Sequence, residues 1–108
     1  MTAKSSPPPA PLWTLDLHGA GPARALQLVQ QEIASRYPRG HSPGLIITGR
    51  GIHSEGGKSP VKAMVKKFLH SAEARTMGVK NVQPDGQGGA FRVDLYAPGQ
   101  APKPTPDP

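Results

Sequence analysis

The sequence predicts an α/β two-layer sandwich, in which a four-stranded mixed sheet carries two helices in the order β-α-β-α-β-β. Four short segments are apolar or alternating, as strands are, and two longer segments repeat their apolar residues at helical spacing. Pro (14) and Gly (13) are numerous among the 108 residues, but nine of the prolines lie outside residues 12–97. One folded domain is therefore predicted over 12–97, with disordered Pro-rich tails at 1–11 and 98–108.

The first half of this domain is predicted to form a strand, a helix and a second strand. Residues 12–18 alternate between apolar and polar, which places Asp16 and His18 together on the polar face of a strand. A helix is predicted from Pro22 until the break at Pro38, with the apolar stripe Leu26, Val29, Ile33 and Tyr37. Residues 44–49 are apolar on both faces, which is typical of a buried central strand.

The second half is predicted to form a helix and two strands. Ser59 followed by Pro60 is a capping residue before a proline at the first helical position. The inward stripe of this helix is predicted to be Val61, Met64, Val65, Phe68, Leu69 and Ala72. The strands are predicted at 78–82 and 90–96, with a flexible connection between them at 83–89.

The charge balance favours a polyanionic partner. Lys and Arg number 13 against 7 Asp and Glu, a formal net charge of +6, which points to nucleic acid first and to an anionic membrane second. A membrane is disfavoured, because the second helix needs its apolar stripe to cover the sheet. The sequence has no Cys, which excludes disulfides and thiolate zinc sites and fits the cytoplasm. We find no apolar run of about 20 residues and no signal-peptide stretch at the N-terminus.

The first candidate site is Asp16 and His18, two residues apart at the end of the first strand. A carboxylate and an imidazole on one strand face can meet one substrate, or the Asp can orient the His. The C-terminal edge of a sheet is where α/β proteins usually bind ligands. The alternative is that both residues cap the following helix by binding its free amides.

The second candidate is the Gly-rich loop from Thr48 to Lys58. It joins a buried strand to a helix, so it suits an anion, and it supplies the cations Arg50, His53 and Lys58. It is not a Walker A loop, because Ile52 stands where the first Gly is required, and Ser54 breaks a dinucleotide fingerprint. The loop therefore predicts phosphate contact without nucleotide hydrolysis, while the alternative is a mobile loop whose glycines only serve turns.

The third candidate is the cationic outer face of the second helix, together with Arg92 on the last strand. This face carries Lys62, Lys66, Lys67 and His70. A charged helix face is often no more than a solvated surface, but here the net positive charge and the adjacent loop favour binding. Aromatic residues are only 5% of the chain, so contacts are expected to fall on phosphates, with low sequence specificity and steep salt dependence.

A metal is not assigned. Asp16, His18 and His53 could in principle converge on a divalent ion, since oxygen and imidazole are suitable donors. No pair of histidines has the helical spacing of a zinc site. A requirement for Mg²⁺ or Mn²⁺ is left open.

These residues resemble the signatures of the small MutS-related (Smr) domain family. LDLHG at 15–19 is similar to its first signature, and TGRG at 48–51 to its TGxG signature. The residues at 53–57 and the Gly-rich turn at 88–93 extend the likeness, which covers roughly 12–97. The resemblance implies a fold like that of the C-terminal domain of translation initiation factor three, and nucleic-acid binding with endonuclease activity. No companion domain of the family, such as a MutS-like ATPase, is predicted within these 108 residues.

Carried onto this chain, the resemblance makes Asp16 and His18 the candidate catalytic residues. It assigns substrate binding to Thr48, Gly49, Arg50 and Gly51. On chemical grounds the amides of Gly49 and Gly51, with Arg50, would hold the scissile phosphate, and His53 and Lys58 would be auxiliary donors. The predicted function is an endonuclease acting on RNA or DNA.

Two rival functions remain. The first is a non-catalytic module that binds nucleic acid or a ribosome through the same basic surface, because not every family member is catalytic. The second is a protein-interaction adaptor whose Pro-rich tails dock in aromatic grooves.

Overall fold

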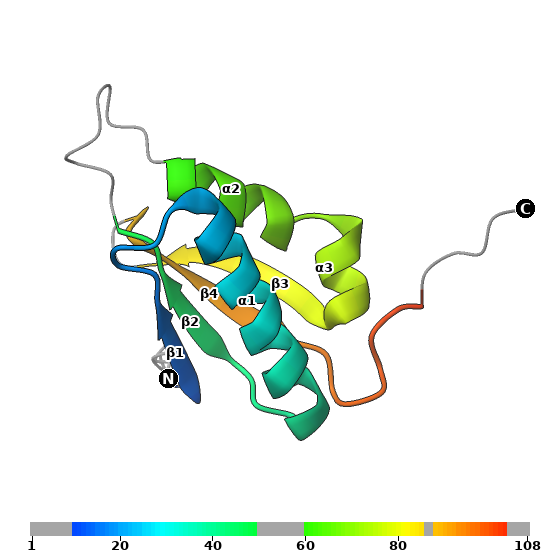
Figure 1. Cartoon of the computed structure of the whole chain (residues 1–108). Coiled ribbons are helices and arrows are strands. Elements are labelled where there is room, and N and C mark those ends of the chain that lie inside the picture. The colour runs from blue at the N-terminus through cyan, green and yellow to red at the C-terminus, as the bar shows by residue number, and fades with distance from the viewer. Residues whose placement is uncertain (1–9, 50–59, 86–87, 104–108) are drawn as a thin grey trace, which may run out of the picture.

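The computed structural model describes residues 10–49, 60–85 and 88–103, and its centre is a four-stranded sheet (Figure 1). The strands lie in the order β1-β2-β4-β3, with β1 parallel to β2 and the other neighbours antiparallel. Their bounds are β1 (Trp13–Asp16), β2 (Gly44–Ile47), β3 (Val79–Asp85) and β4 (Ala90–Leu95). The predicted mixed sheet of four strands is thereby confirmed.

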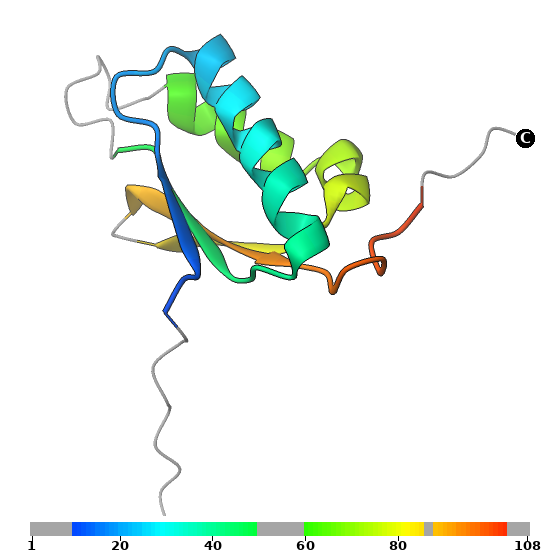
Figure 2. The ribbon, with the colours of Figure 1, turned by 60° about the horizontal axis from the view of Figure 1, so that its bottom comes forward.

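The described helices all lie on one face of the sheet (Figure 2). No described helix covers the other face, which is called the open face below. They are α1 (Pro22–Arg36), the short 3₁₀ helix η1 (Tyr37–Arg39), α2 (Pro60–Leu69) and α3 (Ala72–Met77). The two-layer sandwich and the order β-α-β-α-β-β are confirmed, with the second helical segment divided in two. None of the helices in the described segments combines the length and the apolar composition that a membrane span requires.

The core lies between the helix layer and the sheet, and its best-buried part is formed by α1 and the central strands. Ala25, Val29 and Ile33, each one turn after the last, are fully buried on the inner face of α1. They join Ile46 of β2 and Val93 of β4, which are also fully buried. Burial of each large aliphatic side chain contributes about 1.5–3 kcal/mol. The predicted stripe is confirmed at Val29 and Ile33, while Leu26 and Tyr37 are half-buried against the core and Ala25 is buried in addition.

The second helical segment differs from its prediction. One continuous helix was expected to bury Met64 and Ala72, but Met64 is 37% exposed and Ala72 is also exposed. The chain leaves the helix after Leu69, and Ser71 starts a new helix in which Ala74 is buried instead. The change of direction allows α3 to pack against β3. The predicted stripe assumed one straight helix, so it could not describe two helices with different axes.

Ser71 stabilises this division, which gives a first prediction. Its Oγ accepts a hydrogen bond from the Ala74 N–H at 3.1 Å and donates one to the Phe68 carbonyl at 2.6 Å. We expect Ser71→Ala to lower the free energy of unfolding by about 1 kcal/mol, measured by urea denaturation. Ser35→Ala, at an exposed position within α1, is the matched control and should leave stability unchanged or slightly higher. Equal urea midpoints for Ser71→Ala and Ser35→Ala would contradict the stabilising role of the Ser71 side chain.

The last hairpin is longer than predicted. The strand expected to end at residue 82 continues as β3 to Asp85, and residues 81–85 pair with β4 without a break after a register shift at Lys80. Pro84 signalled a connection, but β3 is an edge strand, where a missing N–H is tolerated on the outer side. The strand expected at 90–96 ends at Leu95.

The start of the predicted second tail contacts the domain. Ala101 donates its backbone N–H to the Tyr37 hydroxyl oxygen at 2.8 Å. Gln100 N–H binds the Ala97 carbonyl at 2.9 Å and closes a turn before this contact. These bonds place the segment beside η1, while the domain boundaries at 12 and 97 stay predictions.

Candidate functional site

Two separate sequence motifs meet at one end of the sheet. β1 and β2 are parallel neighbours, so their C-terminal ends share an edge, and Asp16 pairs with Ile47. The Leu17 N–H extends this pairing by donating to the Ile47 carbonyl at 2.9 Å. A cavity of about 220 Å³ opens at this edge, lined by Asp16, His18, Ile47, Thr48 and Gly49.

Asp16 and His18 form the tight turn that follows β1. The Asp16 Oδ1 accepts a hydrogen bond from the His18 backbone N–H at 2.9 Å, and both residues are exposed. In the described part of the chain, no hydrogen bond joins the carboxylate to the imidazole ring. The alternative that these residues cap α1 is wrong, because Gly21 is the N-cap and no side chain binds there. Both side chains can therefore face a ligand in the cavity.

Gly89 holds the opposite wall of the cavity in place. Its carbonyl accepts the backbone N–H groups of Thr48 and Gly49 at 3.0 and 2.9 Å. Gly49 has a φ of +85°, a left-handed conformation that suits glycine. The expectation that the Gly49 amide holds a phosphate is therefore not met, since that N–H is already engaged. Gly89 was not among the predicted site residues, although it lies in the Gly-rich turn that supports the family resemblance.

The predicted cationic residues are divided between two faces. Lys62 reaches the Gly-rich turn, because a Cβ added to Gly88 would lie 3.2 Å from its Nζ, and Lys66 is exposed on α2. Arg92 pairs with Leu45 of β2 and lies between Phe91 and Val93, which are both buried against the helices. Because neighbouring strand residues point to opposite faces, the Arg92 side chain faces the open side of the sheet. The prediction of one surface joining Arg92 to α2 is wrong, because strand alternation sends Arg92 away from the helix layer.

Arg92 instead shares the open face with Asp16. The register places Asp16 beside Ile47 and Arg92 beside Leu45, two residues earlier on β2. The end of the sheet therefore carries a carboxylate and an imidazole, with a guanidinium one row behind them.

Several predicted residues lie outside the described residues. These are Arg50, Gly51, His53 and Lys58, and also the predicted cap Ser59. Among the residues that the structure describes, no group of three His, Cys, Asp or Glu is placed to hold a metal. Asp16 and His18 provide two such donors at the cavity.

A comparison with protein families bears directly on these motifs. The Smr domain model matches residues 15–96, a span that includes every residue lining the cavity. The chain belongs to the Smr domain family. This family is associated with nucleic-acid binding and nicking, and some of its members are endonucleases. The Smr resemblance predicted from LDLHG and TGRG is confirmed.

Crystal structures of two Smr domains have similar folds. The Smr domain of MutS2 from Thermus thermophilus aligns with a TM-score of 0.60 at 22% identity, covering 77% of this chain and 96% of that one. The human small-MutS related domain aligns with a TM-score of 0.51 at 29% identity, covering 76% of this chain and 99% of that one. Almost the whole of each Smr domain therefore has a counterpart in the present chain.

Proposed function

We propose that this Smr domain binds a nucleic-acid strand at the cavity between Asp16 and Thr48 and cleaves its phosphodiester bonds there. The meeting of Asp16 and His18 of LDLHG with Thr48 and Gly49 of TGRG at one edge of the sheet carries the proposal. Binding in the cavity would place a phosphate against an imidazole and a carboxylate. The net charge of +6 supports a polyanionic ligand.

In this proposal each residue has a separate chemical task. His18 transfers a proton to or from the reacting oxygens, since the two nitrogens of an imidazole can donate and accept protons. Asp16 fixes the turn with one oxygen and can orient the attacking group with its remaining acceptor capacity. Thr48 and Gly49, whose backbone Gly89 holds in place, form the wall of the cavity against which the nucleic-acid strand lies. Arg50, with Lys58 and His53, is proposed to neutralise the phosphate. Arg92 on the open face, and Lys62 and Lys66 on the helix layer, are proposed to contact phosphates on different sides of it.

The test is incubation of the purified protein with end-labelled single-stranded RNA, single-stranded DNA and supercoiled plasmid. Each substrate is offered with EDTA, Mg²⁺ or Mn²⁺, so that the assay identifies the substrate class and the metal requirement together. His18→Ala runs in parallel to exclude a contaminating nuclease. Cutting by the wild type that disappears in His18→Ala is the expected result. Strands retarded but uncut by both proteins would contradict catalysis and leave a binding module.

The cellular location and the partner of the protein are also part of this proposal. We propose a cytoplasmic protein, which fits a sequence without cysteine. RNA or DNA is the proposed partner, and a ribosome would present the same phosphates.

A further inference from the structure

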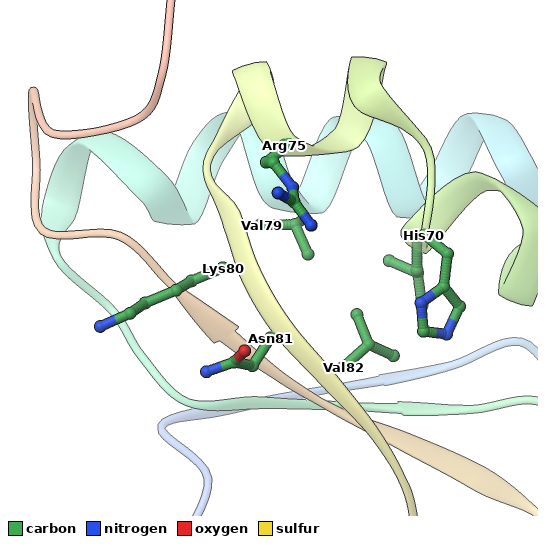
Figure 3. Close-up of a pocket in the computed structure, with 7 residues that line it drawn as sticks. His70, Arg75, Val79, Lys80, Asn81 and Val82 are labelled. Carbon is green, nitrogen blue, oxygen red and sulfur yellow. The ribbon is translucent and has the colours of Figure 1, made fainter.

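A second cavity lies far from the proposed cleavage site, between the α2–α3 junction and the first half of β3 (Figure 3). Its volume is about 170 Å³, room for about five water molecules and hence for a group with the five heavy atoms of a phosphate. Leu69, Val79 and Val82 supply its apolar lining, and the polar lining residues are His70, Arg75, Lys80 and Asn81. These polar residues include three potential cations and no carboxylate.

His70 and Arg75 are the groups aimed into this space. Figure 3 shows their side chains on the same side of β3, above Val79 and Val82, while Lys80 and Asn81 point to the other side of the strand. Both side chains are exposed, and within the described residues neither has a hydrogen-bond or ion-pair partner. A guanidinium and an imidazole that flank an open cavity repel each other when both are charged, and a bound dianion removes that repulsion. The guanidinium also has the geometry for two hydrogen bonds to phosphate oxygens.

A cationic stripe connects this cavity with the other end of the sheet. Lys62, Lys66 and His70 follow one another at four-residue spacing along α2, and the His70 N–H still binds the Lys66 carbonyl at 3.2 Å. Residues at this spacing share a helix face and lie about 6 Å apart along the axis. This separation is close to that of successive phosphates along a single strand. Lys62 begins the stripe beside the Gly-rich turn, whose Gly89 holds the wall of the proposed cleavage site.

We propose that the cavity between His70 and Arg75 binds a backbone phosphate of the same nucleic-acid strand, several nucleotides away from the bond to be cut. The inference rests on the proposed function for the identity of the ligand. It adds a second anchoring point beside the edge strand β3, whereas Asp16 and His18 lie at the end of the opposite edge strand β1. Arg75 supplies the paired donors and His70 closes the opposite side.

The test measures binding of a fluorescently labelled single-stranded RNA by anisotropy at several salt concentrations. Removing one phosphate contact lowers the slope of log K against log salt by about 0.7 for a single strand. Arg75→Gln is therefore expected to weaken binding severalfold at low salt and to reduce this slope. Arg39→Gln removes the same charge from an exposed position on η1, outside the cavity, and should leave the slope unchanged. Circular dichroism checks that both variants are folded.

A second experiment tests whether the cavity binds a nucleic-acid strand or free inorganic phosphate. The His70 ring signals are followed by NMR while RNA or inorganic phosphate is added at constant ionic strength. RNA is expected to shift them at much lower concentration than inorganic phosphate; a shift with phosphate and none with RNA would overturn the proposal.

The outcomes separate this inference from the proposed function. Equal slopes for Arg75→Gln and Arg39→Gln would reject the second anchor while wild-type cutting stands. A wild type that binds no strand would reject both. A wild type that binds but does not cut would reject catalysis alone, and the anchor would still be decided by the slope.

Discussion

His18→Ala protein is expected to bind a labelled strand nearly as tightly as the wild type and to cut it at least about a hundredfold more slowly, because a positioned proton donor or acceptor typically contributes this much. The His18 ring is exposed at the cavity and is not part of the core, so its removal should leave the fold intact. Single-turnover cleavage, with the enzyme in excess over an end-labelled strand, measures the rate separately from binding. Wild-type cleavage by His18→Ala would contradict the proposed mechanism.

Asp16 allows a sharper version of the same experiment. Asp16→Asn keeps an oxygen to accept the His18 N–H and removes only the charge, whereas Asp16→Ala removes both. If the carboxylate takes part in cleavage, both variants lose activity, and Asp16→Ala alone also loosens the turn. Thr14→Ala, two residues earlier at an exposed position on the same strand, should cut like the wild type. Normal cutting by Asp16→Asn would limit Asp16 to a structural role.

Gly44→Ala is expected to destabilise the protein by about 3 kcal/mol, the upper range for forcing extra volume into a packed interior. A Cβ at Gly44 would overlap the Trp13 indole ring, which is 4% exposed and packed in the core. The ring has little freedom to move, because its Nε1–H donates to the His41 carbonyl at 2.8 Å. Thermal and urea denaturation would measure the loss.

Gly21→Ala is the matched control for this substitution. A Cβ at Gly21 meets nothing within 4 Å, and its φ of −75° is open to any residue. Its cost should stay below about 1 kcal/mol, the usual effect at a helix N-cap. In a double-mutant cycle with Trp13→Leu, the cost of Gly44→Ala should shrink as the ring is removed. An unchanged cost in that background would show that Trp13 is not the obstacle.

The local sequence pattern predicted the helices and strands correctly wherever interactions between neighbouring residues determine the structure. The alternation around Asp16, the apolar run after Gly44 and the breaks at Pro22 and Pro38 each indicated the correct element, because strand and helix periods depend on neighbours in the chain. The same reasoning failed at Met64 and Ala72, since a second helix axis starts at Ser71. It also failed at Pro84, whose tolerance depends on β3 being an edge strand.

The candidate site shows the same contrast. LDLHG and TGRG were both visible as motifs, and the family likeness paired them. Their convergence around one cavity depends on the parallel pairing of β1 with β2, which no local pattern encodes. The engagement of the Gly49 amide by Gly89, forty residues further along the chain, is likewise a product of the β2–β4 pairing.

The family, the fold class and the order of the elements could all be predicted from the amino-acid sequence, and so could the candidate residues. Their contacts could not: Asp16 and His18 meet Thr48, Arg92 lies on the open face, and His70 and Arg75 flank a second cavity only once the chain is folded. Periodicity and capping act within a few residues, whereas strand pairing and helix packing join residues far apart in the chain.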